Sequence, residues 1–415
     1  MREVPPTAGL PLEWRDLWGG GSPPLAGRAA AFLGLPEAQV ECSGTACLIV
    51  ALMTLRAMSP RRTVIIPAFT CPLVPLAVAH CGLRVQLCDL AADHFDMDHR
   101  MLARLCNDDT LAVVPTHLAG RVANVARARM HARAVGAWVI EDAAQALGAR
   151  HDGSCVGTLA DIGFFSLAVG KGLTSYEGGI LCASDPALRA AMRRTSERII
   201  RSNGWLELGR TLQLLGYAVC YQPRLLRFVY GAPLRQALRR GDLAKAAGDL
   251  AGQPIPLHRL GRWRGSVAAR AFERLAEFQA ALAALARSRR ATLERIDGLK
   301  VLGDSPGTDG AWPCLLVLMP NEAARDAALA HLWHAGVGVS RLFVHALPDY
   351  AFLAAIVPPA QATHATQARS FAARTLTLSN SPWLGETQFE LIVRILGWAV
   401  DSVSRMDSSS CLSSR

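Results

Sequence analysis

Short apolar runs alternate with longer mixed segments over the first half of the chain. The runs fall at residues 63–66, 83–88, 111–114 and 137–140, and helix-like stretches separate them. Strands of a parallel sheet covered on both faces are apolar throughout, and helices connect them. We therefore expect an α/β fold with a mostly parallel sheet in a large domain over residues 27–200, preceded by an N-terminal segment, 1–26. Functional side chains of such a domain lie where strands end and loops begin.

Residues 201–261 interrupt this alternation. Their apolar, uncharged stretch at residues 211–222 is too short to span a bilayer. Two interpretations remain open. The segment is either a helical insert that packs on the protein's own core or on a second subunit, which we favour, or an interfacial helix that places residues 205–230 on an anionic membrane. The second interpretation draws on the arginines that follow the stretch, at Arg224, Arg227, Arg235, Arg239 and Arg240.

The remaining sequence predicts a second, smaller unit. An alanine-rich stretch with scattered charges predicts a connecting helix over residues 262–299. Apolar runs at residues 313–318 and 375–378 predict strands of a small C-terminal α/β domain over residues 300–405. The tail at residues 406–415 is polar and of low complexity, so we expect it to be disordered.

Composition narrows the class of protein. Apolar residues make up 51% of the 415 positions and charged residues 19%, which indicates a folded chain with a large interior. The N-terminus lacks the apolar core of a secretory signal, and no later run predicts a membrane span, so we expect a cytoplasmic protein. The eleven cysteines are scattered without CxxC pairs, which argues against disulfides and against a zinc site. No metal is therefore predicted.

The formal net charge of +10 comes mainly from arginines at residues 189–201 and 224–264. This excess suits a nucleotide diphosphate, an acidic membrane surface or nucleic acid, although a solvated basic face without a partner is the simplest interpretation. The sequence contains none of the common DNA-binding or RNA-binding motifs. We therefore predict no nucleic-acid partner.

A short polar motif precedes one of the apolar helices. Ser43, Gly44 and Thr45 follow a short strand candidate and open the helix that begins at Ala46. Hydroxyls and free backbone N–H groups at a helix N-terminus form an anion site that suits a phosphate group. Serine and threonine are also ordinary N-caps, so the motif by itself does not decide between these roles.

Asp142 comes directly after the apolar run at residues 137–140 and Glu141. It should therefore lie at the carboxyl end of a strand, where it either caps the next helix or faces a ligand. Gln145 follows three residues later, about one helical turn away, and can address the same ligand.

Lys171 lies in a loop of apolar and small residues, and no other charge occurs between Asp161 and Glu177. Burial would lower the pKa of this lysine and favour the neutral amine, which is the nucleophile. A buried lysine together with a carboxylate at a strand end is the pair that pyridoxal phosphate (PLP) chemistry needs. The lysine holds the cofactor as a Schiff base, and the carboxylate keeps the pyridine nitrogen protonated.

Six motifs in this order resemble the DegT/DnrJ/StrS family of PLP-dependent aminotransferases, often called sugar aminotransferases. The resemblance covers residues 27–200 well and 262–400 loosely. The motifs are Ser43-Gly44-Thr45-Ala46, Pro67-Ala68-Phe69-Thr70, Val114-Pro115-Thr116-His117 with Gly120, Glu141-Asp142-Ala143-Ala144-Gln145, Phe165-Ser166 with Lys171, and Glu177-Gly178-Gly179.

The resemblance implies a fold-type I architecture and a homodimer whose active sites lie between subunits. By the same resemblance, Lys171 and Asp142 are the catalytic residues: Lys171 binds the cofactor covalently and Asp142 pairs with its ring nitrogen. Gln145 contacts the ring. The phosphate is held by the residues at the other strand and helix ends, Ser43, Gly44, Thr45 and Ser166.

Three departures from the family pattern bear on the substrate. Cys71 stands where many members have an aromatic residue that stacks on the cofactor ring. The family's Asn-x-Arg element, which reaches the partner subunit's cofactor, corresponds to Arg262-Trp263-Arg264, so only Arg264 is kept. The insert at residues 201–261 is also longer than the family pattern implies.

The resemblance implies a transfer of an amino group, from an amino acid such as glutamate to a keto sugar nucleotide, in polysaccharide or secondary-metabolite biosynthesis. A PLP-dependent dehydratase, or an aminotransferase for a non-sugar ketone, is the first alternative. Lys171 favours transfer, because histidine occupies this position in the family's dehydratase branch. A membrane-associated PLP-fold protein without turnover is the second alternative, suggested by Cys71, Arg262 and the insert.

Overall fold

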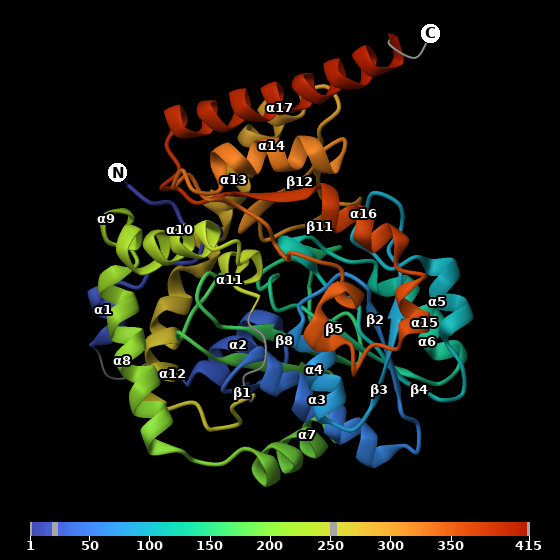
Figure 1. The fold of residues 1–415 in the computed structure, drawn as a ribbon. Helices are drawn as coiled ribbons and strands as arrows, with labels where there is room; N and C mark the ends of the chain where they lie inside the picture. The colour runs from blue at the N-terminus through green and yellow to red at the C-terminus, as the bar shows by residue number, and fades with distance from the viewer. Residues whose placement is uncertain (1, 19–23, 250–254, 413–415) are drawn as a thin grey trace.

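A seven-stranded sheet forms the centre of the large domain in the computed structural model, which describes residues 2–18, 24–249 and 255–412 (Figure 1). Its strand order is β1-β9-β8-β5-β4-β2-β3. The five strands β8, β5, β4, β2 and β3 run parallel, and β9 and β1 are antiparallel to their neighbours. The prediction of a mostly parallel sheet is therefore confirmed. The strands are β1 (Gln39–Glu41), β2 (Thr63–Pro67), β3 (Arg84–Cys88), β4 (Thr110–Val113), β5 (Trp138–Asp142), β8 (Ile162–Ser166) and β9 (Gly179–Ala183).

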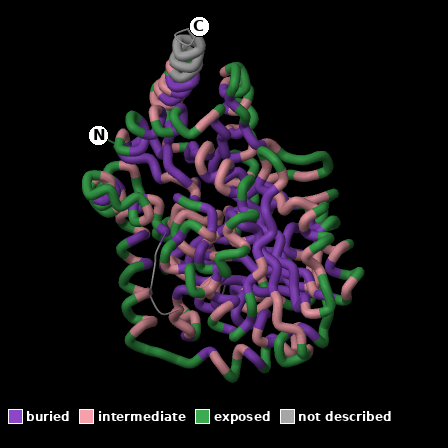
Figure 2. Tube along the Cα trace, turned by 45° about the vertical axis from the view of Figure 1, so that its right-hand side comes forward, coloured by how far each residue is buried: buried purple, intermediate pink, exposed green. Residues whose placement is uncertain are grey.

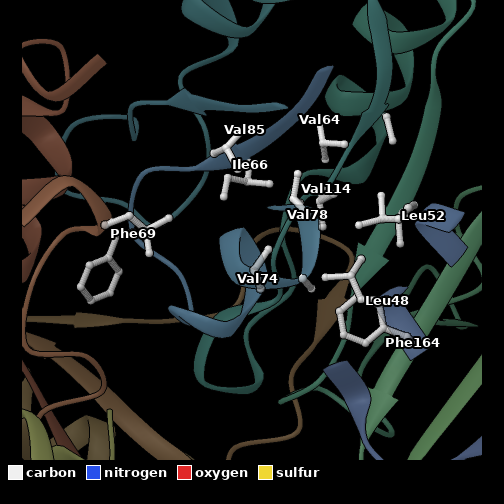
Figure 3. Packing of buried hydrophobic residues seen from close by; sticks show 14 of the residues in the cluster. Leu48, Leu52, Val64, Ile66, Phe69, Val74, Val78, Val85, Val114 and Phe164 are labelled. Atoms are coloured by element: carbon white, nitrogen blue, oxygen red, sulfur yellow. The ribbon is translucent and has the colours of Figure 1, made fainter. Parts of the chain in front are cut away.

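Alternate residues of these strands enter different apolar cores. Val64 and Ile66 of β2 pack with α3 (Gly44–Met58) and α4 (Leu73–His80), as Figure 3 shows for Leu48, Leu52, Val74 and Val78. Ile65, between them, packs instead with α5 (His99–Leu105) and α6 (Val125–Ala134). Both faces of the sheet are thus covered by helices, which explains why its central strands are mostly apolar. The helix α7 (Pro186–Ile199) packs beside α3.

The small domain is built on a four-stranded antiparallel sheet in the order β10-β12-β14-β13. Its strands are β10 (Lys300–Leu302), β12 (Cys314–Leu318), β13 (Val339–Ser340) and β14 (Thr375–Ser379). The helices α14 (Glu322–Leu332) and α17 (Glu386–Leu412) pack against each other in this domain. The two predicted apolar runs, at 313–318 and 375–378, thus form the two central strands.

The C-terminal helix extends into the segment for which the sequence predicts disorder. α17 continues to Leu412, whereas the predicted tail begins at residue 406. Once a helix is formed, each further residue adds one hydrogen bond without repeating the cost of nucleation, so polar residues can extend it. Residues 413–415 of the predicted tail lie outside the described residues.

The predicted connecting helix consists of two helices. α12 (Arg262–Ala271) and α13 (Leu275–Leu293) are joined by the short helical turn η3 (Phe272–Arg274). The remaining short elements are α1 (Trp14–Leu17), α2 (Leu25–Leu33), α15 (Pro359–Ala362), α16 (Thr366–Arg374), the turns η1 (Leu118–Gly120), η4 (Leu347–Asp349) and η5 (Ala351–Leu353), and a small sheet of β6 (Arg150–His151), β7 (Ser154–Cys155) and β11 (Thr308–Asp309).

The insert at residues 201–261 is helical, as the sequence predicts, and one side of it packs on the same chain. Leu214 and Tyr217 on its longest helix share an apolar cluster with Leu17 and Val267. In Figure 1 the longest helix, α8, lies at the left edge of the molecule. Within the described residues, no helix is long and apolar enough to cross a membrane. The helical segments are α8 (Gly204–Cys220), α9 (Pro223–Leu226), η2 (Arg227–Gly231), α10 (Ala232–Arg239) and α11 (Leu243–Ala247).

Candidate active site

The residues singled out by the sequence converge on the carboxyl edge of the large sheet. Asp142 is the last residue of β5, and Ser166 is the last residue of the neighbouring strand β8. Ser43 is the N-cap of α3, which packs against β8. Parallel strands place their carboxyl ends at one edge of the sheet, so three distant motifs meet there.

The N-terminus of α3 forms a cradle for an anion. The Ser43 hydroxyl accepts a hydrogen bond from Ala46 N–H at 3.0 Å, which leaves the N–H groups of Gly44 and Thr45 at the open first turn. A Cβ atom at Gly44 would lie only 3.1 Å from Cβ of Ser166. Glycine therefore lets the helix end approach closely to the strand end that carries Ser166. This donor set fits a phosphate group.

Asp142 is almost completely buried, with 4% of its surface exposed. Its Oδ1 accepts a hydrogen bond from Ala144 N–H at 3.1 Å, and Oδ2 has no partner among the described residues. Burial raises the pKa of this carboxyl, and the nearby Lys171 and His117 oppose that shift. A cationic N–H group placed against Oδ2 would therefore stabilise the carboxylate. The protonated pyridine nitrogen of PLP is such a group.

A buried histidine and glutamate support the strand that carries Asp142. His117 Nδ1 accepts a hydrogen bond from Ala123 N–H at 3.0 Å, so Nε2 carries the proton toward Glu141 Oε2, 3.2 Å away. Glu141 also accepts hydrogen bonds from Gly157 N–H and Ala160 N–H, at 2.8 and 2.7 Å. The backbone N–H of His117 donates to the Asp142 carbonyl at 2.9 Å. The pair of His117 and Glu141 therefore holds the backbone of Asp142 in place.

Gln145 also has a defined place. Its Oε1 accepts a hydrogen bond from Ala119 N–H at 2.8 Å. Ala119 has a φ of +51°, a left-handed conformation that costs free energy in a residue with a side chain. Gln145 therefore stabilises the strained turn after His117. Its side chain is half-buried beside the Asp142 turn, and the bonded Oε1 leaves the amide N–H₂ end available to a ligand.

Lys171 is half-buried at the centre of these groups. Burial lowers the pKa of its amine, and the charges of Cys71, Asp142 and Cys314 act in the opposite direction. These interactions place a thiol from the large domain, a thiol from β12 of the small domain and the Asp142 carboxylate around the amine. A lowered pKa increases the fraction of neutral amine, which can attack an aldehyde.

The N-terminal segment lies across the Lys171 loop. Thr7 Oγ1 donates a hydrogen bond to the Gly170 carbonyl at 2.8 Å, and Leu10 N–H donates to the Gly172 carbonyl at 3.3 Å. Between them, Gly9 N–H donates to the Tyr221 hydroxyl at the end of α8, at 3.3 Å. The N-terminal segment thus holds the loop on both sides of Lys171, and the insert in turn holds the N-terminal segment. The sequence analysis did not identify this arrangement, which joins segments more than 150 residues apart.

Cys71 lies near the amine of Lys171, as its place after Thr70 in the motif implies. It is half-buried, and burial raises the pKa of its thiol to about 11. The charges of Lys171 and Asp142 both act on the thiol. The thiol of Cys71 is therefore neutral and polarisable near neutral pH.

Arg264 is fully buried and lies in a different network. Its Nε and Nη2 donate to both carboxylate oxygens of Glu207 on α8, at 2.7 and 2.6 Å. Its Nη1 donates to the carbonyls of Ser175 and Glu177, at 3.0 and 2.6 Å. Within one chain the arginine therefore joins the loop after Lys171 to the insert, and the structure does not bring it to the Asp142 and Lys171 side chains.

A carboxylate of the insert, which the sequence analysis did not select, reaches the edge of the site. Asp249 is 8% exposed and accepts hydrogen bonds from the Tyr350 hydroxyl and from Val344 N–H, the latter at 2.9 Å. Its charge acts on the Cys71 thiol. Asp249 therefore joins the insert to the small domain through Val344 and Tyr350.

One protein family matches the part of the chain that carries these residues. The model of the DegT/DnrJ/EryC1/StrS aminotransferase family matches residues 13–225, half of the chain. Protein MosB of Rhizobium meliloti is 36% identical over 151 residues, 36% of this chain and 30% of MosB. The dTDP-3-amino-3,4,6-trideoxy-alpha-D-glucose transaminase of Streptomyces venezuelae is 28% identical over 362 residues, 86% of this chain and 81% of that enzyme.

A solved structure extends the likeness to both domains. The PLP-form of the putative sugar aminotransferase Spr1654 from Streptococcus pneumoniae matches with a TM-score of 0.71, over 97% of this chain and 99% of that chain. Its sequence is 16% identical, so the likeness concerns the fold. The chain spans 30%, 44% and 62% of the length of the first curated relatives. On the match to its residues 13–225, the chain belongs to the DegT/DnrJ/EryC1/StrS aminotransferase family.

Proposed function

We propose that the protein is a PLP-dependent aminotransferase that moves an amino group from an amino acid, glutamate, to a keto sugar nucleotide. The observation that carries the proposal is the pair formed by Lys171 and Asp142. A lysine with a lowered pKa faces a buried carboxylate at the end of β5. Family membership supports the reaction type, and the names of relatives that act on nucleotide sugars support the acceptor class.

Each residue of the site has a part in this proposal. PLP, when bound, supplies an electron sink for the carbanion formed at the substrate carbon. Asp142 holds a proton on the ring nitrogen, and the α3 cradle with Ser43, Gly44, Thr45 and Ser166 binds the phosphate.

Lys171 has the central part in the proposal. In this proposal its Nζ would hold the cofactor and would move the proton at the substrate α-carbon. Gln145 and Cys71 would contact the cofactor ring in this proposal. In the single chain Arg264 orders the loop at residues 175–177. A homodimer, which the family resemblance implies, is part of the proposal and is tested by sedimentation.

The half-reaction with glutamate tests the reaction type. Purified protein loaded with PLP should show the visible absorbance of the lysine-bound cofactor. Adding glutamate without an acceptor should shift this band and release one equivalent of 2-oxoglutarate per site. Lys171→Ala should show neither change, whereas Lys300→Ala, which alters an exposed lysine, should behave as the wild type. A wild-type protein that binds PLP but releases no 2-oxo acid with glutamate or with any other amino donor would contradict the proposal.

The acceptor requires a separate experiment. The aminated protein should be mixed with keto sugar nucleotides and with non-sugar ketones, including the keto-cyclitol 2-deoxy-scyllo-inosose. Return of the visible band only with keto sugar nucleotides supports the proposal. Return of the band only with a non-sugar ketone favours the first alternative, and elimination of water without consumption of glutamate favours a dehydratase.

A further inference from the structure

The insert presents an apolar surface to solvent on the side opposite its packing with the core. Trp205, Leu208, Leu212 and Val219 recur at helical spacing along α8, and 86%, 49%, 60% and 43% of their respective surfaces are exposed. The following turn η2 adds Phe228 and Val229, with 57% and 54% exposed. We call these six side chains the α8 surface. Exposed apolar groups of this size, gathered on one segment, mark an interaction site.

The same segment carries most of the protein's net positive charge. Residues 201–261 contain nine lysines and arginines and three acidic residues, a net charge of +6 out of +10 for the whole chain. Arg224, Arg227 and Arg239 are exposed and have no ion-pair partner among the described residues. The Arg227 guanidinium lies 4.4 Å from the ring of Phe228. Cations therefore flank the apolar side chains at the end of α8.

α8 and α9 form one outer layer of the molecule. Leu214 and Tyr217 of α8 and Leu226 of α9 enter the same apolar cluster, so the two helices turn their other sides outward together. Both lie along the left edge in Figure 1, and exposed segments line this edge in the rotated view of Figure 2. The α8 surface is thus a feature of the folded chain, and it lies apart from the Lys171 pocket.

Charge and apolarity together select the partner. We propose that the α8 surface docks the protein on a membrane with anionic lipids. Leucine, valine and phenylalanine side chains enter the region below the headgroups, tryptophan favours the interface, and the arginines contact lipid phosphates. Nucleic acid would satisfy the arginines but not the aliphatic side chains. A second copy of the same surface would bring two segments of charge +6 together, which costs electrostatic free energy. The contact is peripheral, because no described helix can cross the bilayer.

Flotation with lipid vesicles tests the inference without use of catalysis. The full-length protein should float with vesicles of phosphatidylcholine containing 30% phosphatidylglycerol and remain in solution with phosphatidylcholine alone. Each arginine near an anionic surface contributes roughly a factor of five. Replacing Arg224, Arg227 and Arg239 with glutamine should therefore weaken binding by about 100-fold. Trp205→Ala should weaken it by about tenfold, since it removes one of the largest apolar groups.

Matched variants outside the insert serve as controls. Arg100, Arg104 and Arg133 on α5 and α6 are also exposed, and their replacement with glutamine removes the same charge. Trp398→Ala removes an exposed tryptophan from α17. Both controls should float as the wild type does. Failure of the wild type to float, or equal losses in the control variants, would overturn the inference. So would a Trp205→Ala variant that sediments at half the mass of the wild type, since the surface would then join two copies.

Discussion

The large domain and the insert both contain apolar helices, yet their apolar side chains meet different surroundings. On α3 the buried residues cover most of the helix, because it packs against the sheet, α4 and α7. On α8 only Leu214 and Tyr217 are buried, and the opposite side exposes Trp205 and Leu212. The comparison teaches that apolarity alone does not say which surface a helix covers. The neighbouring strands decide which sides of a helix are covered, and the described part of the insert, residues 201–249 and 255–261, contains no strand.

The largest expected effect concerns the buried pair that supports Asp142. Glu141→Ala should lower the free energy of unfolding by about 3–5 kcal/mol, because His117, Gly157 N–H and Ala160 N–H all lose a buried acceptor. Chemical denaturation measures this change. Glu390→Ala, at an exposed position of α17, should change the value by less than about 0.5 kcal/mol. Equal effects of the two substitutions would mean that the buried pair is not a support of the site.

The pH dependence of cofactor capture should follow the amine of Lys171. Burial lowers its pKa from 10.5, and only the neutral amine attacks an aldehyde. Below the pKa the rate should rise about tenfold per pH unit, and it should level off at a lower pH than for a solvated lysine of pKa about 10.4. Stopped-flow absorbance after mixing cofactor-free protein with PLP measures the profile. A rate that still rises above pH 10 would contradict the lowered pKa.

Two glycines contrast the domain and the insert directly. Gly44→Ala places a methyl group 3.1 Å from Ser166 Cβ, so it should separate the helix end from the strand end and weaken PLP binding by about tenfold. Gly209→Ala lies on an open face of α8 with no atom within 4 Å, and it should raise the free energy of unfolding by about 0.5–1 kcal/mol. Fluorescence titration and denaturation measure the two effects. Unchanged PLP affinity in Gly44→Ala would mean that the N-terminus of α3 does not bind the phosphate.

A smaller effect is expected where the two regions meet. Tyr221→Phe removes the acceptor of Gly9 N–H and should lower stability by about 1 kcal/mol. It should also raise the hydrogen-exchange rate of residues 168–172 in cofactor-free protein, because the N-terminal segment that holds this loop loses one contact. Phe32→Leu, a change in an apolar contact between Phe32 and Phe272, should leave exchange of the loop unchanged. Equal hydrogen-exchange rates in Tyr221→Phe and wild type would mean that the insert does not stabilise the loop at residues 168–172.

The sequence predicted the elements whose pattern is local, and it did not predict the contacts between distant segments. The strand at residues 138–142 and the helix after Ser43 have clear apolar patterns, so Asp142 and the α3 cradle could be placed. The hydrogen bonds of Tyr221 with Gly9 and of Asp249 with Tyr350 join segments 212 and 101 residues apart. The hydrophobic periodicity of a sequence does not reveal contacts between such distant residues. Arg264 was selected by motif, but its partner Glu207 lies in the insert, where the motif gives no information.

Covalent trapping of the cofactor tests the central claim most directly. The chain contains three lysines, Lys171, Lys245 and Lys300. Protein incubated with PLP and reduced with borohydride should carry one pyridoxyl group per chain, and peptide mass mapping should place it on Lys171. A label on Lys245 or Lys300, or no label on Lys171, would contradict the assignment of the site.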